Sequence, residues 1–360
     1  MSELGAFVIA AGGTGGHIVP GIALGHEIKS QKHGALVAFI GTSHGLEGKL
    51  VPQAGFPLEL IEAAGFVGKT VGRQIGALAK LPKGFLASRA LLKKYRARVV
   101  IGVGGYVTVP VITAARSLGI PTLIHESNAL PGVSNKFLNK FATKTAVGIP
   151  EANSGFKKPG IVTGTPVRSE FFAIPPVDPA ATTRRVLVFG GSQGSRVMNR
   201  AVARAGVLLE KTGIELIHQT GDGDLVATKQ RYARVPANWK LVPFLPKMWE
   251  EMAWADLVVS RAGALTVAEL AAAGRPSILI PFVGGGNHQI YNAKALYQRG
   301  AAALMEERNL TAENLAGAIT EKLKDREKLV LMGQKARALA RPDAAKDLAK
   351  LVFSLEEARR

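Results

Sequence analysis

Short apolar runs alternate with longer amphipathic stretches along almost the whole chain. The short apolar runs predict buried strands, and the longer amphipathic stretches between them predict helices. An alternation of strands and helices is typical of α/β proteins built on parallel sheets. The strands predicted in this way are residues 6–11, 36–40, 99–103, 122–125, 145–148, 185–189, 215–219, 240–242, 257–260 and 277–281.

This series of strand and helix units starts twice. An irregular, proline-rich segment, residues 164–179, separates the two series, and a new strand with its own glycine loop follows it. We therefore predict two Rossmann-like domains, residues 1–164 and 165–342, joined near residues 163–166. The last amphipathic stretch, residues 343–360, is expected to form a helix that packs back on the first domain.

The composition fits a folded chain with two cores: 47% of the 360 residues are hydrophobic and 20% are charged. No uninterrupted apolar run reaches about 18 residues, and the first residues lack the features of a signal peptide, so we expect neither a membrane span nor export. The chain has no cysteine, which excludes disulfides, thiolate metal sites and a cysteine nucleophile.

The net charge of +19 implies an anionic partner. Residues 66–98 carry nine Lys and Arg and no acidic residue, and these cations interleave with Phe, Leu, Ile and Val. Such a mixture predicts contact with an anionic membrane surface; the alternative is a helix packed on the sheet with its lysines in water. We expect no nucleic-acid partner, because only 6% of the residues are aromatic and no recognition motif is present.

Glycine loops follow three of the predicted strands. Gly12-Gly13-Thr14-Gly15-Gly16-His17 leads from a strand into a helix, which predicts a cradle for a phosphate or, alternatively, only a tight turn. The second strand ends in Gly41-Thr42 rather than in an acidic residue, and this disfavours a nicotinamide cofactor. Gly190 to Gly194 repeats the arrangement in the second domain, and Gly104-Gly105-Tyr106 follows a third strand. We expect a ligand in the cleft between the domains.

A further segment, Ser260 to Glu269, runs from a strand end into a helix. Its small residues would let a ligand approach the backbone, and the Glu269 carboxylate could accept both hydroxyls of a ribose. A solvated helix face is the alternative for Glu269.

The ordered set of Gly12 to His17, His125 to Asn128, Gly164 to Arg168, Gly190 to Gly194, Ser260 to Glu269 and Asn287 to Ala293 resembles the MurG family. The resemblance implies a GT-B fold, with two parallel sheets facing across a cleft. It also implies an inverting transfer of N-acetylglucosamine from UDP-N-acetylglucosamine to the 4-hydroxyl of N-acetylmuramic acid in lipid I, which gives lipid II for peptidoglycan. The C-terminal domain would hold the donor and the N-terminal domain the lipid-linked acceptor.

The same resemblance implies roles for single residues. For the catalytic base we expect His17, with Glu126 and His125 as second choices; alternatively, His17 caps its helix or orients the acceptor diphosphate. The expected acceptor-binding residues are Gly12, Gly13, Gly104, Gly105, Tyr106 and His125, and the alternative for Tyr106 is an aromatic ring packed in the fold. The expected donor-binding residues are Thr14, Gly15, Gly16, Asn128, Arg168, Ser192, Leu245, Ala264, Leu265, Thr266, Val267, Ala268, Glu269 and Gln289.

Two segments depart from the family pattern: Ser127 stands where glutamine is usual, and Gly284 to His288 replaces a charged, glutamine-rich loop. Asp222-Gly223-Asp224 resembles a metal-binding D-x-D motif, but its place in a glycine turn before a helix favours ordinary helix caps. We therefore expect no obligatory metal, with a divalent cation limited to stimulating the reaction at the diphosphate.

The resemblance also implies a peripheral location at the cytoplasmic face of the bacterial cell membrane, with other cell-wall synthesis proteins as further partners. Two alternatives within the GT-B fold stay open: a UDP-N-acetylglucosamine 2-epimerase, and a glycosyltransferase acting on a glycolipid or a natural product.

Overall fold

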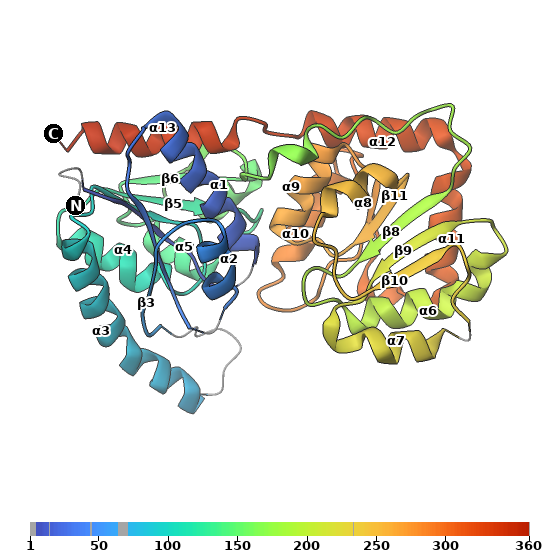
Figure 1. Cartoon of the computed structure of the whole chain (residues 1–360), viewed down its shortest axis with the longest axis horizontal. Coiled ribbons are helices and arrows are strands. Elements are labelled where there is room, and N and C mark those ends of the chain that lie inside the picture. The colour runs from blue at the N-terminus through green and yellow to red at the C-terminus, as the bar shows by residue number, and fades with distance from the viewer. Residues whose placement is uncertain (1–4, 14, 44, 64–70, 233, 360) are drawn as a thin grey trace. The chain divides into compact units, whose positions relative to one another are not determined.

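The computed structural model describes residues 5–13, 15–43, 45–63, 71–232 and 234–359, with the backbone alone for residues 71–81. The chain divides into two compact units (Figure 1). The first unit is Met1–Val167 together with Arg341–Arg360, and the second is Arg168–Ala340. The chain thus passes from the first unit to the second after Val167, where the sequence predicts Gly164, and returns to the first unit after Ala340, where it predicts residue 342.

The first unit is built on a parallel sheet with the strand order β3-β2-β1-β4-β5-β6-β7. The order runs in opposite directions on the two sides of the β1–β4 pair, so the crevice at the carboxyl ends of these two strands is a topological switch point. Ligands of open α/β sheets bind at such points. The strands are β1 Phe7–Ala10, β2 Val37–Gly41, β3 Leu58–Leu60, β4 Val99–Gly102, β5 Thr122–Glu126, β6 Lys144–Val147 and β7 Ile161–Val162.

Both faces of this sheet are covered by helices, and β1 shows how. Phe7 and Ile9 belong to one core cluster with α1 and α13, whereas Val8 and Ala10 belong to a second cluster with α3 and α4. Alternate residues of a strand point to opposite faces, so a strand covered on both faces is apolar throughout. The helical segments of the unit are α1 Gly15–Gln31, α2 Glu47–Gln53, α3 Val71–Lys94, α4 Thr108–Ser117, α5 Val133–Leu138, η1 Pro150–Gly155 and α13 Ala344–Glu357.

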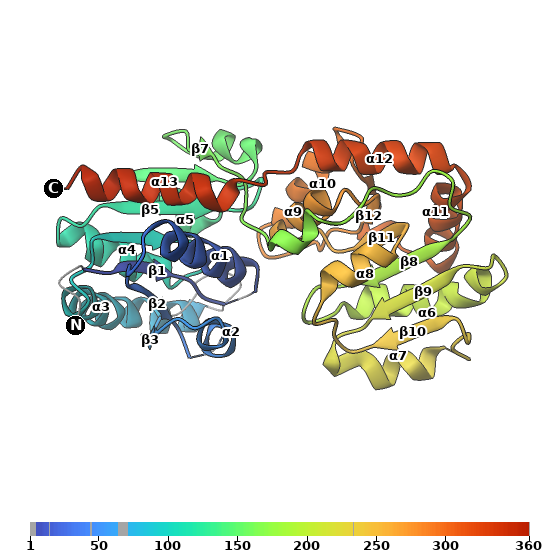
Figure 2. The ribbon, with the colours of Figure 1, turned by 45° about the horizontal axis from the view of Figure 1, so that its top comes forward.

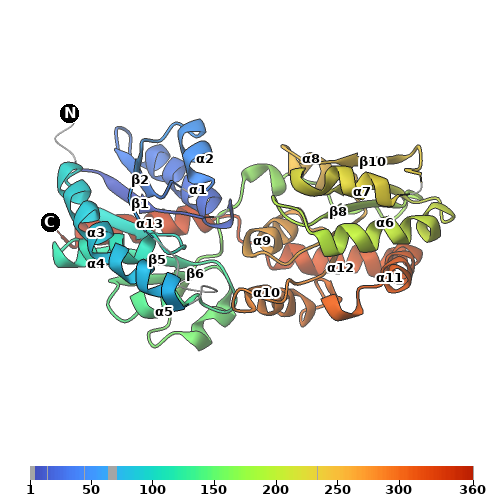
Figure 3. The ribbon, with the colours of Figure 1, turned by 90° about the horizontal axis from the view of Figure 1, so that it is seen from below.

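The last helix of the chain, α13, packs on the first unit beside α1 and over the sheet (Figure 2). Leu348, Val352 and Leu355 are buried in the same core as Phe7. The buried carboxylate of Glu356 pairs with Lys32 at 2.7 Å and with Arg98 at 3.2 Å. On the opposite face, α3 lies side by side with α4 (Figure 3).

The second unit repeats this topology in a parallel sheet of order β10-β9-β8-β11-β12-β13, with its switch point between β8 and β11. Its strands are β8 Arg185–Phe189, β9 Glu215–Gln219, β10 Trp239–Val242, β11 Leu257–Ser260, β12 Ser277–Leu279 and β13 Ala303–Leu304. Its helical segments are η2 Ser169–Phe171, α6 Arg196–Glu210, η3 Asp222–Asp224, α7 Leu225–Arg231, α8 Met248–Trp254, α9 Ala264–Ala273, α10 His288–Tyr297, η4 Glu307–Asn309, α11 Ala312–Lys324 and α12 Arg326–Ala338.

The two parallel sheets confirm the predicted α/β class and the two Rossmann-like bodies. Every strand that the apolar runs predict is present, with ends shifted by at most two residues. The strands β3, β7 and β13 were not predicted, because each is an edge strand of only two or three residues. Among the described residues, no helix combines the length and the apolar character needed to cross a membrane.

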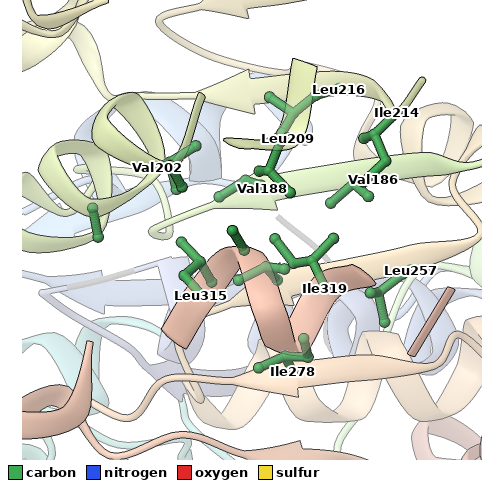
Figure 4. Close-up of a cluster of buried hydrophobic side chains, with 14 of the residues drawn as sticks. Val186, Val188, Val202, Leu209, Ile214, Leu216, Leu257, Ile278, Leu315 and Ile319 are labelled. Atoms are coloured by element: carbon green, nitrogen blue, oxygen red, sulfur yellow. The ribbon is translucent and has the colours of Figure 1, made fainter. Parts of the chain in front are cut away.

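The core of the second unit offers a direct test of its packing. Ile319 of α11 has no exposed surface and lies among Leu315, Leu257 and Ile278 (Figure 4). We expect Ile319→Ala to lower the free energy of unfolding by about 2–5 kcal/mol, and Ile319→Val by about 0.5–1.5 kcal/mol, because each leaves a cavity. Tryptophan fluorescence during chemical denaturation measures this, since Trp239, Trp249 and Trp254 all lie in the second unit.

The matched control is Val207→Ala on α6, where the side chain is 60% exposed. We expect this change to stay within about 0.5 kcal/mol of the wild type. Equal destabilisation by Ile319→Ala and Val207→Ala would contradict the packing described for this core.

Candidate active site

The switch point of the first unit brings two glycine loops into direct contact. A Cβ on Gly105 (φ +83°) would lie 2.5 Å from the carbonyl oxygen of Gly12, and a Cβ on Gly104 (φ +113°) would lie 2.6 Å from Cδ2 of His17. Both distances are shorter than real Cβ contacts, and both backbone angles are in the left-handed region that favours glycine. The loop after β1 can therefore touch the loop after β4 only because residues 104 and 105 lack side chains.

The imidazole of His17 is oriented by this contact. Its Nδ1 lies 3.3 Å from the carbonyl oxygen of Gly12, and a carbonyl can only accept a hydrogen bond. Nδ1 therefore carries the proton in the neutral ring, and Nε2 is the nitrogen with the basic lone pair. The ring lies against Gly104, so Nε2 is at the switch point of the unit.

The other predicted residues of the first loop are placed in part. Thr14 lies outside the described residues. Gly15 and Gly16 form the first turn of α1, and both are half-buried. The N–H of Gly13 donates to the carboxylate of Glu47 at 3.1 Å, so this N–H is not offered to an anion, contrary to the simple phosphate cradle that the sequence predicts.

Glu126, the second choice for the base, is held in a dense network. One carboxylate oxygen accepts from the backbone and side-chain amides of Asn128, both at 2.9 Å. The other accepts from the N–H of Gly132 and the side-chain amide of Asn135, both at 2.9 Å. Four donors occupy this buried carboxylate, which organises the loop after β5 that carries Asn128. A proton-accepting role for Glu126 stays a prediction without support from this geometry.

His125 is fully buried, and both of its ring nitrogens have partners. Nε2 lies 3.0 Å from the carbonyl oxygen of Gly164, so it donates, and Nδ1 lies 3.3 Å from the hydroxyl of Ser127. Burial lowers the pKa of His125, which keeps the ring neutral. Ser127, which departs from the family pattern, thus bonds a neutral histidine. With no exposed surface, His125 supports the loop and has no face for an acceptor in this structure.

The glycine loop of the second unit makes a similarly tight turn into α6. A Cβ on Gly190 would lie 2.5 Å from the backbone nitrogen of Ser195, and Gly191 and Gly194 have φ angles of +88° and +72°. The hydroxyl of Ser195 accepts from the N–H of Met198 and caps the helix. The turn leaves Ser192 exposed, where its hydroxyl can meet a ligand.

Arg261 ties the loops of the second unit together and was not among the predicted contacts. It donates to the carbonyl oxygen of Ile280 at 3.0 Å and to the hydroxyl of Ser195 at 2.9 Å, and it pairs with Glu307. Only 6% of Arg261 is exposed. The sequence does contain a signal for this role, because Arg261 is a charged residue among small and apolar ones in the segment Ser260 to Glu269.

Glu269 and Arg168, two predicted donor-binding residues, lie together in the second unit. Glu269, on α9, is 7% exposed, and burial raises the pKa of its carboxyl to about 7, although Arg168 acts in the opposite direction. A guanidinium nitrogen of Arg168 lies 3.7 Å from the carboxylate, and the guanidinium carbon lies 4.5 Å from the ring centre of Trp249. The pair offers one acceptor group and one cation in the second unit.

The rest of the predicted donor segment presents mainly backbone. Ala264, Leu265, Thr266 and Ala268 are half-buried at the start of α9, and a helix start carries N–H groups without partners in the helix. Val267 is buried in the core at 2% exposure, so a ligand could reach only its backbone. Leu245, which follows β10, is also buried, at 6% exposure.

Gln289 connects two loops at the same edge of the sheet. Its side-chain oxygen accepts from the N–H of Ala262 at 3.2 Å and from the N–H of Phe282 at 3.0 Å. The amide nitrogen is then the group that Gln289 can offer to a sugar. The preceding loop, residues 284–287, has four consecutive positive φ angles, which explains why this departure from the family pattern consists mostly of glycine.

Asp224 of the D-x-D motif is used inside the fold. Its carboxylate accepts from Asn199 at 2.8 Å, Thr228 at 3.2 Å and Arg231 at 3.3 Å. Asp224 occupies the N-cap position of α7, as predicted, but its carboxylate accepts from no backbone N–H of that helix, so the predicted capping hydrogen bond is absent at this residue. Within the described ranges, no group of three His, Asp or Glu side chains is arranged to hold a metal ion.

The described residues that the sequence predicts for the site therefore fall into two groups, one in each unit. Asn128 lies in the first unit, as do Gly15 and Gly16, whereas the other described donor-binding residues lie in the second.

Comparisons with known proteins match a family domain to each half of the chain. Residues 7–147 match the glycosyltransferase family 28 N-terminal domain, and residues 185–348 match the glycosyltransferase family 28 C-terminal domain. A curated relative from Syntrophotalea carbinolica is 41% identical over 345 residues, which cover 94% of this chain and 95% of the relative. That relative is a UDP-N-acetylglucosamine–N-acetylmuramyl-(pentapeptide) pyrophosphoryl-undecaprenol N-acetylglucosamine transferase.

Among solved structures, MurG from Acinetobacter baumannii is 31% identical, with a TM-score of 0.80 over 97% of this chain and 99% of that one. A UDP-N-acetylglucosamine 2-epimerase fold from Listeria monocytogenes is 12% identical, with a TM-score of 0.71 over 96% and 95% of the two chains, and shares the fold alone. The chain therefore belongs to glycosyltransferase family 28 and, within it, to the MurG family of UDP-N-acetylglucosamine glycosyltransferases.

Proposed function

We propose that this chain transfers N-acetylglucosamine from UDP-N-acetylglucosamine to the 4-hydroxyl of the N-acetylmuramic acid in lipid I, and so produces lipid II for peptidoglycan. Support comes from the near full-length relative at 41% identity, whose name states this donor and a muramyl-pentapeptide pyrophosphoryl-undecaprenol acceptor. The observation that carries the chemistry is the orientation of His17 by the carbonyl of Gly12. Roles in cell shape, cell division and assembly with other cell-wall enzymes would follow from this activity.

In the proposed donor complex, the second unit binds UDP. Glu269 accepts the two ribose hydroxyls, backbone groups near Leu245 contact the uracil, and Ser192 with the first turn of α9 contacts the diphosphate. Arg168, whose guanidinium is held loosely by Glu269 at 3.7 Å, turns its charge toward the diphosphate. Gln289 and Asn128 offer amide groups to the sugar.

The proposed reaction is a single displacement with inversion at the anomeric carbon. The muramyl oxygen forms a bond to that carbon while the bond to the UDP oxygen breaks, and the hydroxyl proton passes to Nε2 of His17. UDP leaves as an anion, stabilised by the helix N-terminus and by Arg168, so no general acid is needed. We propose no obligatory metal, with a divalent cation limited to stimulation at the diphosphate.

We further propose that the chain works as a peripheral protein on the cytoplasmic face of the membrane. Residues 66–70 of the basic stretch lie outside the described residues, and only the backbone is described up to residue 81. In the rest of α3, Phe85, Leu91 and Leu92 pack in the first unit, so this part of the stretch follows the alternative prediction of a helix packed on the sheet. The opposite face is exposed and carries Lys83, Leu86 and Lys93, a mixture suited to an anionic lipid surface.

Substitution of His17 tests its role as the base. We expect His17→Ala to lower kcat for transfer of radiolabelled sugar to a soluble lipid I analogue by about 10²- to 10⁴-fold, because the hydroxyl loses its proton acceptor. The KM for UDP-N-acetylglucosamine should stay within about twofold, since the described donor groups of the second unit remain. Full activity in this variant would leave His17 without a catalytic role. Release of free N-acetylmannosamine by the wild type would instead favour the epimerase alternative.

The pH dependence of UDP binding tests the role of Glu269. The Glu269 carboxyl has a pKa of about 7, and only its deprotonated form accepts both ribose hydroxyls, so affinity should fall as the pH falls below 7. The phosphates of UDP also titrate in this range. The variant Glu269→Gln removes only the carboxyl, so the change in its affinity with pH measures the contribution of the phosphates. We expect the ratio of wild-type to variant affinity, measured by calorimetry, to fall roughly tenfold from pH 8 to pH 6. A ratio that does not change with pH would contradict the role of Glu269.

Charge reversal on α3 tests its contact with the membrane surface. We expect the double variant Lys83→Glu with Lys93→Glu to bind phosphatidylglycerol vesicles at least about 30-fold more weakly in sedimentation, at roughly 1 kcal/mol per lost cation. Lys94 is left unchanged because it pairs with Glu59 at 2.7 Å. The matched control reverses Lys229 and Lys324, two exposed lysines of the second unit. Equal binding by the two double variants would contradict a lipid contact on α3.

A further inference from the structure

Glu47 is a fully buried acidic residue whose role the activity does not yet explain. It is the first residue of α2 in the first unit, and its exposed fraction is 0%. Among the described residues, no Lys, Arg or His forms an ion pair with it. A buried carboxylate without a cation is costly, so its retention requires compensating hydrogen bonds.

Three donors from the carboxyl ends of two strands supply that compensation. One carboxylate oxygen accepts from the N–H of Thr42 at 2.9 Å and from its hydroxyl at 2.7 Å. The other accepts from the N–H of Gly13 at 3.1 Å. Thr42 directly follows β2 and Gly13 belongs to the loop after β1, so one side chain connects two adjacent strand ends.

The hydroxyl of Thr42 extends this connection to a third strand end. A carboxylate can only accept, so Thr42 Oγ1 donates its proton to Glu47. The hydroxyl of Tyr106 lies 3.4 Å from Thr42 Oγ1 and must then be the donor of that pair. The proton of Tyr106 is directed inward, and Tyr106 presents an oxygen acceptor to whatever binds at the loop after β4.

Glycines make room for this carboxylate. A Cβ on Gly41 would lie 2.7 Å from Cγ of Glu47, and a Cβ on Gly12 would lie 3.1 Å from a carboxylate oxygen. A Cβ on Gly45 would overlap the other carboxylate oxygen. The loops around Glu47 are therefore shaped for an acidic side chain at this position.

We propose that Glu47 is a positioning residue for the acceptor, and this inference rests on the proposed function. By holding the N–H of Gly13 and, through Thr42, the proton of Tyr106, it fixes the loops after β1 and β4 in the arrangement that places His17. It also decides which hydrogen-bonding groups these loops present to the acceptor. The Gly13 N–H is used by Glu47, whereas the Tyr106 oxygen can accept a hydrogen bond from the acceptor. The acceptor is a prenyl diphosphate sugar, which carries both anionic oxygens and hydroxyl donors.

The test compares Glu47→Gln with Glu59→Gln in the same unit. Glu59 is the matched control because it also accepts from a hydroxyl, that of Tyr95 at 2.8 Å, but lies on β3. Glutamine keeps the size of Glu47 but turns an NH₂ group toward one of the three donors. We expect Glu47→Gln to raise the KM for a soluble lipid I analogue about tenfold or more, while the Kd for UDP stays within about twofold. Glu59→Gln should leave both values within about twofold.

Thr42 provides a second pair of variants that keep the Glu47 charge. Thr42→Val removes the hydroxyl that joins Tyr106 to Glu47, and we expect the acceptor KM to rise at least about threefold. Thr42→Ser retains that hydroxyl and should restore the wild-type value. This pair decides the matter if Glu47→Gln fails to fold.

A merely structural role would change the active fraction, and so kcat, with the acceptor KM unchanged. Acceptor KM values within twofold of the wild type in both Glu47→Gln and Thr42→Val would overturn the proposal. A wild type that binds UDP but transfers no sugar would instead contradict the proposed function.

Discussion

Close contact of backbone with backbone at the ends of the central strands is the constraint on which the rest of this structure depends. Gly105 lies so near the carbonyl of Gly12 that no side chain fits, and Gly104 is covered by the ring of His17. Gly190 and Gly194 meet the same limit in the second unit. In each sheet the strand order reverses between the first and the fourth strand of the unit, and this reversal leaves a crevice at the carboxyl ends of the two strands. Glycines let the loops at this crevice pack closely enough to orient single side chains.

Buried carboxylates take different roles according to their surroundings. Glu126 and Glu47 each accept hydrogen bonds from several donors, and each carboxylate thereby holds the loops that supply these donors. Glu269 has one distant cation and few donors, and burial raises the pKa of its carboxyl to about 7. A carboxylate with unused capacity to accept hydrogen bonds is suited to bind a ligand, whereas a saturated one is suited to shape a site.

Much of the fold was predictable from the sequence, because strands buried on both faces are apolar throughout and stand out between amphipathic helices. The edge strands β3, β7 and β13 were not, since they are two or three residues long and owe their pairing to the neighbouring strand. The glycine loops were found because glycine after an apolar run marks a strand-to-helix turn. The partners of their side chains were not predictable, because Glu47 reaches Gly13 across 34 positions and Arg261 reaches Ser195 across 66.

The most direct measurement of the central proposal is a crystal structure of this chain with UDP bound. We expect the ribose hydroxyls within hydrogen-bonding distance of Glu269, the diphosphate against Ser192 and the start of α9, and Arg168 turned toward the phosphates. A uridine bound at the glycine loops of the first unit, or anywhere away from Glu269, would contradict the assignment of the donor to the second unit.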